Sequence, residues 1–151
     1  MISITRLREF LVETKTKING INFTELIIDD SQFISFLKER KEAENSMLFG
    51  VIPQYPLEGQ EDMYKWLNQL QFFIIKKRSA RFNHDELLNN MEETRALAQE
   101  FVEYIILNSV GESNLFCGLS NELVSGSLLV MPIWNKGQCD GWAIEFDLRT
   151  S

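Results

Sequence analysis

The residues best suited to chemistry are one histidine and two cysteines, and their sequence contexts favour no reaction. His84 is the single histidine, so a site built from several histidines is excluded and one imidazole is left for acid–base work. It directly follows Asn83 at the start of a predicted helix, which favours an exposed side chain. Cys117 and Cys139 fit no zinc spacing, and neither lies in the positive environment that activates a thiol. Two free thiols are favoured, and a disulfide between them stays open.

Adjacent carboxylates are frequent in the chain, but their spacing does not build a site. Neighbouring residues of a helix or strand project in different directions, so helix caps and solvated faces explain the pairs better than a glycosidase or Mg²⁺ site does. The chain also contains no phosphate-binding loop, dinucleotide fingerprint or nucleophile elbow. We therefore predict no enzymatic activity, no catalytic or metal-binding residue, no cofactor and no small-molecule substrate. The pairs are Asp29-Asp30, Glu61-Asp62, Asp85-Glu86 and Glu92-Glu93.

One basic cluster stands out in a chain whose formal net charge is -7. It follows the apolar residues 70–75, which predict a strand. The cluster could contact phosphates or an acidic neighbouring subunit. We favour a third interpretation, in which these charges keep a very apolar strand from aggregating. The members of the cluster are Lys76, Lys77, Arg78 and Arg81.

Tryptophan supplies the other candidate contacts with a partner, because its large side chain often anchors interfaces. Trp142 is in phase with the apolar residues of its predicted strand, which places it in the core. Trp66 follows an acidic loop and is the tryptophan that we expect to be most exposed. The candidate interface residues are therefore Trp66, Lys76, Lys77, Arg78 and Arg81.

Length and composition predict one globular domain that spans residues 1–151. The chain is 44% hydrophobic, 25% charged and 11% aromatic, so it can form a core without a metal or a disulfide. A chain with a pI near 4.8 repels phosphate, which disfavours nucleic acids and anionic membranes as partners. The sequence shows neither a signal peptide nor the run of about 18 apolar residues that a membrane span needs. We expect a cytoplasmic protein.

Hydrophobic periodicity predicts two helices in the first third of the chain. Residues 4–18 carry an apolar stripe, and Gly20 ends this helix. Residues 29–31 form a cap for a short helix that ends in the charged residues 38–42. Between the two helices, residues 21–30 fit a short strand or a helical turn equally well.

The longest predicted helix begins after Asn83, whose side chain can accept a backbone N–H of the first turn. Glu86 stands where the partner in a capping box would stand. The helix can extend to residue 108 and carries an apolar stripe along its length. The stripe consists of Leu87, Met91, Ala98, Phe101 and Ile105, widened by Leu88, Val102 and Ile106.

Two apolar stretches in the middle of the chain predict strands. Residues 47–52 form a short strand that Pro53 ends. Residues 70–75 have large apolar side chains on both faces, which is typical of a central strand covered on both sides.

A hairpin is predicted at the end of the sequence, from residues 128–134 and 142–149, with the polar residues 135–141 as its connection. Its second strand alternates between large apolar and polar side chains, so one face is expected to be wet. Together these elements predict an α+β fold. It has a mixed or antiparallel sheet of about four strands, one long helix packed on a face, and smaller N-terminal helices.

Three parts of the chain also carry a family resemblance. An apolar strand ends in Ile-Pro-Gln-Tyr-Pro at residues 52–56. Residues 72–75 lead through a polar link into Asn-His-Asp-Glu at 83–86 and the long helix. Residues 139–148 form a closing strand with a Gly-Trp pair. In this order and spacing, residues 47–148 resemble small tail-completion proteins, of the tail-terminator type, from phages and prophages of Bacteroidetes-type bacteria.

The resemblance implies an α+β fold, no catalysis, and a homo-oligomeric ring at the tip or neck of a phage tail. It implies contacts with other copies or other tail proteins, in the bacterial cytoplasm or within a virion. The loop at residues 56–62 and the cluster at 76–81 would then face neighbours of opposite charge. Replacing Lys76, Lys77 and Arg81 by Glu is expected to disrupt such an assembly.

Two other hypotheses stay open. The first is a small acidic protein-binding module, immunity-like or adaptor-like, which would capture one basic partner. The second, and least favoured, is an enzyme that uses His84 or Cys139.

Overall fold

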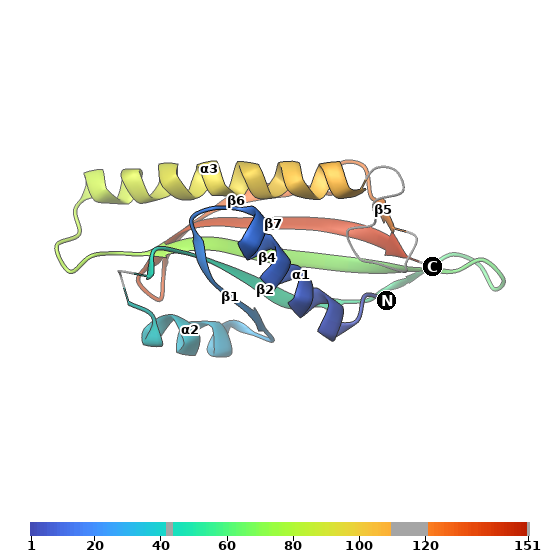
Figure 1. Cartoon of the computed structure of the whole chain (residues 1–151). Coiled ribbons are helices and arrows are strands. Elements are labelled where there is room, and N and C mark those ends of the chain that lie inside the picture. Colours follow the sequence, from blue (N-terminus) through green and yellow to red (C-terminus); the bar gives the residue numbers. More distant parts are fainter. Residues whose placement is uncertain (42–43, 110–120, 151) are drawn as a thin grey trace.

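A mixed β-sheet forms the centre of the computed structural model, which describes residues 1–41, 44–109 and 121–150 (Figure 1). Its strands are β1 (Ile21–Ile27), β2 (Ser46–Gln54), β3 (Leu57–Glu58), β4 (Lys65–Lys77), β5 (Asn121–Leu123), β6 (Leu129–Lys136) and β7 (Cys139–Thr150). The main path through the sheet is β1-β2-β4-β7-β5, with β3 paired to β4 and β6 paired to β7. The pair β1–β2 is parallel and the other pairs are antiparallel. The predicted α+β class is confirmed, with five main strands in place of about four.

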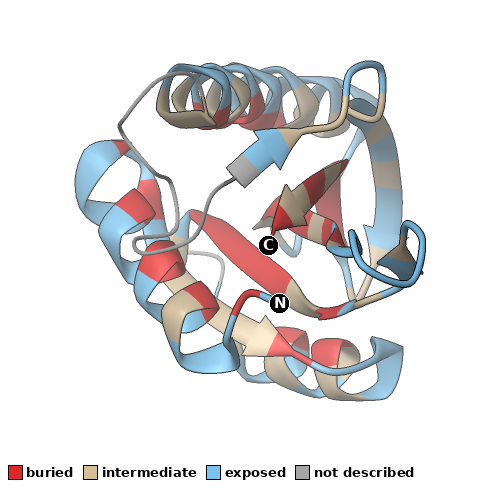
Figure 2. Cartoon of the chain, turned by 90° about the vertical axis from the view of Figure 1, so that its right-hand side faces the viewer, coloured by how far each residue is buried: buried red, intermediate tan, exposed pale blue. Residues whose placement is uncertain are grey.

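Three helices cover this sheet in the described part of the chain: α1 (Ile4–Lys17), α2 (Asp30–Glu39) and α3 (His84–Ser109). Figure 2 looks along the sheet and shows α1 and α3 on one side and α2 on the other. The expectation of one long helix on a face, with smaller helices from the N-terminal third, is confirmed. The segment that fitted either a strand or a turn is the strand β1.

The helix starts follow the capping residues that the sequence offers. The Asp29 side chain accepts the backbone N–H of Gln32 at 2.9 Å, and the Asn83 side chain accepts that of Glu86 at 2.9 Å. Both bonds satisfy a donor that a helix leaves unpaired. The Glu86 carboxylate does not complete a capping box, because it accepts the backbone N–H of Ser79 at 3.2 Å.

The buried stripe of α3 differs from the prediction in its first half. Ala98, Phe101 and Ile105 are buried as expected, but Asn90 and Thr94 continue the buried line toward the N-terminus. Thr94 can be buried because its hydroxyl donates to the carbonyl of Asn90 at 2.7 Å. Two residues expected to widen the stripe, Leu88 and Ile106, are exposed.

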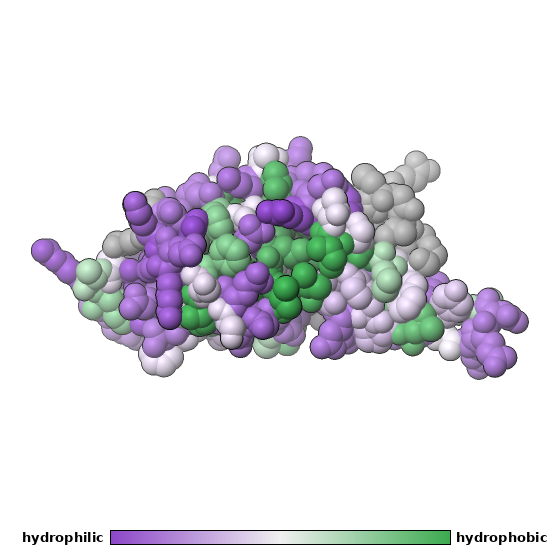
Figure 3. All heavy atoms as spheres, turned by 90° about the horizontal axis from the view of Figure 1, so that it is seen from below, coloured by the Kyte–Doolittle hydropathy of each residue, from purple (hydrophilic) through white to green (hydrophobic). Residues whose placement is uncertain are grey.

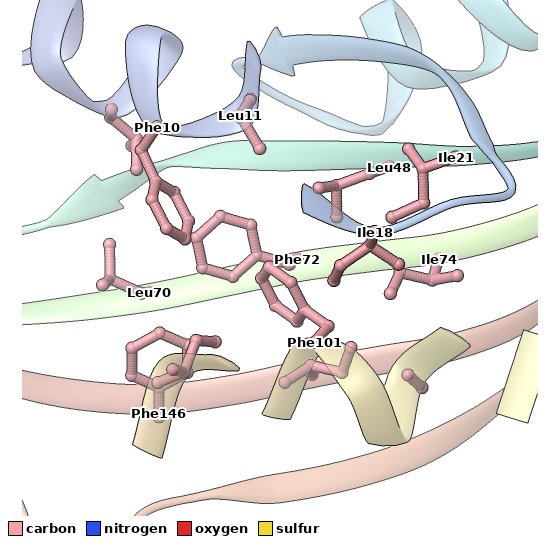
Figure 4. Packing of buried hydrophobic residues seen from close by; sticks show 14 of the residues in the cluster. Phe10, Leu11, Ile18, Ile21, Leu48, Leu70, Phe72, Ile74, Phe101 and Phe146 are labelled. Carbon is pink, nitrogen blue, oxygen red and sulfur yellow. The ribbon is translucent and has the colours of Figure 1, made fainter. Parts of the chain in front are cut away.

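The strand β4 lies at the middle of the sheet and has a core on each face, as predicted. On the face of α1 and α3, Phe72 packs against Phe10 and Phe101, with ring centroids 5.8 and 5.1 Å away (Figure 4). On the face of α2, Phe33 packs against Phe73 with centroids 4.8 Å apart. Burial of large aromatic side chains on both faces makes β4 the strand around which the fold is built.

Two strand boundaries differ from the prediction. The strand β2 continues through Pro53, which lies where the register with β4 shifts between Val51 and Gln54. A register shift tolerates proline because the ladder there needs no N–H from it. The connection between β6 and β7 is a turn of Gly137 and Gln138, with φ of 56° and 62°, in place of the predicted residues 135–141.

Candidate interaction surfaces

Arg78 follows β4 directly and closes the turn between β6 and β7. Its Nε and Nη2 donate to the two carboxylate oxygens of Asp140 at 2.6 and 2.7 Å, and Asp140 is fully buried. The same carboxylate accepts the backbone N–H of Asn135 at 2.8 Å, and the backbone N–H of Arg78 donates to Gln138. The hydrogen bond to Asp140 raises the pKa of Arg78. This residue therefore stabilises the hairpin within its own chain.

The two lysines of the basic cluster also have partners within the chain. Lys76 forms an ion pair with Glu93 of α3. The Lys77 ammonium donates to the carbonyls of Leu37 and Arg40, at 3.2 and 2.7 Å, at the C-terminal end of α2. A cation at this position favours the helix because the last carbonyls carry partial negative charge. The lysines thus hold two helices against the end of β4.

Arg81 is the member of the predicted cluster that is left for an outside contact. It is exposed and makes no ion pair with any described residue. Beside it in sequence, Phe82 is 38% exposed and stacks on the Arg78 guanidinium at 4.1 Å. The Trp134 ring also lies near that guanidinium, with its centroid 5.6 Å away. We call Arg81, Phe82 and Trp134, together with the Arg78 guanidinium that contacts both rings, the cationic end.

The tryptophans are placed differently from the prediction. Trp66 is half-buried, because β4 extends back to Lys65 and pairs Trp66 with Leu57 and Thr150. The expectation that it would be the most exposed tryptophan is wrong: Trp134 of the outer strand β6 is 69% exposed. Trp142 donates its indole N–H to the carbonyl of Met91 in α3 at 3.0 Å. It is half-buried against the core of α1 and α3, as its phase predicted.

A hairpin arm, residues 57–64, projects beyond the sheet between β3 and β4 (Figure 1). Its turn requires Gly59, whose φ is 118° and where a Cβ atom would lie 2.3 Å from the carbonyl oxygen of Met63. Large apolar side chains are exposed on it, with Met63 at 84% and Tyr64 at 57%. The exposed carboxylates of Glu61 and Asp62 lie between these residues and Gly59 in sequence. The arm is therefore both apolar and acidic.

The arm and the cationic end lie at opposite ends of the molecule. The arm leads into β4 at Lys65, and the cationic end begins after Lys77. Thirteen residues separate the two ends of this strand, which at about 3.3 Å per residue is about 43 Å. One copy cannot bring the two surfaces together.

A groove lies on the face of the sheet that carries α2. One hollow of 560 Å³ is lined by residues that include Ile28, Val51, Gln71 and Asp147. A second hollow of 730 Å³, between the start of α2 and β6, shares Gln71 with the first. Seen from the side of α2, hydrophobic residues gather in the middle of this face and hydrophilic ones surround them (Figure 3). We call the two hollows together the groove.

The polar groups of the groove include glutamines of β4 and carboxylates of β7. The Gln71 amide donates to the Glu145 carboxylate at 2.6 Å. Burial raises the pKa of Asp147, and the nearby Glu58 raises it further, against the opposing effect of Arg149. At the far end, Lys136 of β6 forms an ion pair of 2.6 Å with Asp30 of α2. The groove therefore combines an apolar centre with carboxylates.

The structure describes two of the three residues considered for chemistry. His84 is exposed at the start of α3. Cys139 is a free, buried thiol in β7, and burial raises its pKa to about 12, whereas Cys117 lies outside the described residues. Across residues 1–41, 44–109 and 121–150, no three His, Cys, Asp or Glu side chains are grouped as metal ligands. Nor does this part of the chain contain a helix long and apolar enough to cross a membrane.

Comparison with known proteins adds no relative to this description. No protein-family model matches the chain, and no curated protein matches its sequence. The arm, the cationic end and the groove are therefore judged on their own geometry. Sequence reasoning found Arg81 and the acidic loop, considered Trp134 as an interface anchor but ranked Trp66 above it for exposure, and missed Phe82, Met63 and Tyr64.

Proposed function

We propose that the chain is a non-enzymatic structural subunit, of the tail-completion type that its sequence resembles, and that copies of it associate head to tail. The observation that carries this proposal is the placement of two unlike exposed surfaces at opposite ends of β4. The arm offers carboxylates beside apolar side chains. The cationic end offers Arg81 beside two aromatic rings. A contact between them would pair opposite charges around buried aromatic groups.

This kind of contact determines the form of the assembly. Because it joins different surfaces of two copies, every dimer still has one free arm and one free cationic end. Copies therefore add until the ring closes, or continue as a filament where the rotation between neighbours does not close. A closed ring is what the resemblance to tail-completion proteins implies.

The contacts within the chain also indicate which cation to mutate. Reversing Lys76 or Lys77 would break contacts to α3 and α2, so a lost assembly would not distinguish a lost interface from a damaged fold. Arg81 is exposed, so its reversal tests an outside contact alone.

The proposal is tested by the solution mass over a concentration series, measured by size-exclusion chromatography with light scattering. We expect a discrete oligomer for the wild-type chain and a monomer for Met63→Asp, which places a charge on the tip of the arm. Leu107→Asp is the matched control, because Leu107 is an apolar residue of α3 that is 72% exposed outside both surfaces. It should assemble like the wild type. A strict monomer at every concentration would overturn the proposal and favour the acidic binding module.

A further inference from the structure

The groove exists because α2 is too short to cover its face of the sheet. At about 1.5 Å per residue the ten residues of α2 span about 15 Å, whereas β4 is about 43 Å long. The helix covers the half that contains Phe49 and Phe73, which are buried. Beyond it Ile28 is 66% exposed. Among the described residues, no helix therefore covers the part of this face that carries Val51, Gln71 and Glu145.

The groove carries two carboxylates, Glu145 and Asp147, that no cation of the described residues pairs with. Glu145 and Asp147 alternate along β7 on the face of α2, and neither forms an ion pair with a described residue. The next cation on that face, Arg149, is bound at 2.8 Å by Glu58 and at 3.8 Å by Glu122. The carboxylates therefore favour an occupant that brings its own cations.

We propose that the groove binds an extended, basic segment of a partner protein, with apolar side chains on the sheet and lysine or arginine against Glu145 and Asp147. The amides of Gln69 and Gln71 lie on the same strand face and can bond the backbone of an extended segment. The two hollows lie next to each other along the sheet, since both are lined by Gln71, and this row of hollows suits an extended chain better than a compact ligand.

The occupant is a different protein, and in this respect the inference goes beyond the proposed function. A second copy of this chain has an acidic arm, which the carboxylates of the groove repel, and its exposed Arg81 is engaged by the arm of a neighbour in the proposed head-to-tail contact. The phosphates of a nucleic acid are repelled for the same reason.

Fluorescence anisotropy with a labelled, terminally blocked (Lys-Val)₄ peptide tests this inference directly. We expect the wild-type chain to bind this peptide and not (Glu-Val)₄. The double variant Glu145→Gln/Asp147→Asn keeps the shape of both side chains and should weaken binding at least about tenfold, because two charge-assisted contacts are lost. An unchanged melting temperature or a higher one will show that the variant is folded.

The matched control is Glu100→Gln/Glu103→Gln on the exposed side of α3, which removes the same charge. In the wild-type chain the Glu103 carboxylate accepts the side-chain amide of Gln99 at 3.0 Å, just as Glu145 accepts the side-chain amide of Gln71. This control, and the arm variant Met63→Asp, should bind (Lys-Val)₄ like the wild type even if self-association is abolished. The inference is overturned if (Lys-Val)₄ does not bind the wild-type chain or if Met63→Asp abolishes binding. It is also overturned if Glu145→Gln/Asp147→Asn and the control Glu100→Gln/Glu103→Gln weaken binding equally.

Discussion

The ion pair between Arg78 and Asp140 gives the sharpest prediction about stability. Asp140→Ala leaves the guanidinium, whose side chain is 12% exposed, without its two shortest hydrogen bonds. It also leaves the backbone N–H of Asn135 without its acceptor. A charge that stays largely buried without its partner is costly, so the variant should be strongly destabilised.

The magnitude follows from this geometry. Removing one member of a buried pair costs about 3–5 kcal/mol. Because Arg78 is slightly exposed, the expected loss in the free energy of unfolding is about 3 kcal/mol. For a domain of this size, each kcal/mol lowers the melting temperature by about 2–4 °C. We therefore expect a decrease of about 6–12 °C.

Urea unfolding followed by tryptophan fluorescence measures this loss, with the slope m checked for constancy. Arg78→Met and the double variant complete a mutant cycle, in which the two residues should be coupled by about 2 kcal/mol. Arg81→Ala is the control, since Arg81 is exposed, and it should leave the midpoint unchanged. If Asp140→Ala shifts the midpoint no more than Arg81→Ala does, Arg78 does not hold the hairpin and is again a candidate for outside contacts.

Three further predictions concern single residues. Asn83→Ala should lower the free energy of unfolding by about 1 kcal/mol in urea unfolding, because the first turn of α3 loses its cap. Cys139 should resist iodoacetamide at pH 8 until the chain unfolds, as mass spectrometry would show, because its pKa is about 12 and its side chain is buried; rapid labelling of the folded chain would contradict this. Asp147→Asn should raise the melting temperature at pH 7. Because the pKa of Asp147 is raised in the folded chain, its carboxyl group binds a proton more tightly there than in the unfolded chain. The contribution of Asp147 to stability is therefore fully favourable below its ordinary pKa and is lost as the pH rises through its pKa in the folded chain. The gain in melting temperature should vanish at a pH below the ordinary pKa of an aspartate. An equal gain at that pH would refute the direction of this pH dependence.

The sequence predicted those elements whose residues agree locally with the fold. Residues 72–75 are apolar on both faces, and this part of β4 is buried on both faces. Asn83 is a good cap by type and by position, and it caps α3. The alternation in the last strand predicted one polar face, and Glu145 and Asp147 lie on it.

Features that depend on distant residues could not be predicted in this way. Asp140 looked like part of a polar loop because its partner, Arg78, is 62 residues away in the sequence. The groove depends on how far α2 reaches along the sheet, which no local pattern gives. Trp134 is 69% exposed on β6, a strand that pairs with β7 alone in the described part of the chain, and this position at the edge of the sheet was not evident from the sequence.

The head-to-tail contact is tested most directly by mixing two variants, each of which lacks one of the two surfaces. Met63→Asp keeps its cationic end, and Arg81→Glu/Trp134→Ser keeps its arm. Each should be a monomer alone. Mixed in equal amounts they should form a heterodimer of twice the 17.6 kDa chain mass and nothing larger, because only one complementary pair of surfaces remains. A mixture that stays monomeric by light scattering, or that forms larger assemblies, would contradict the account.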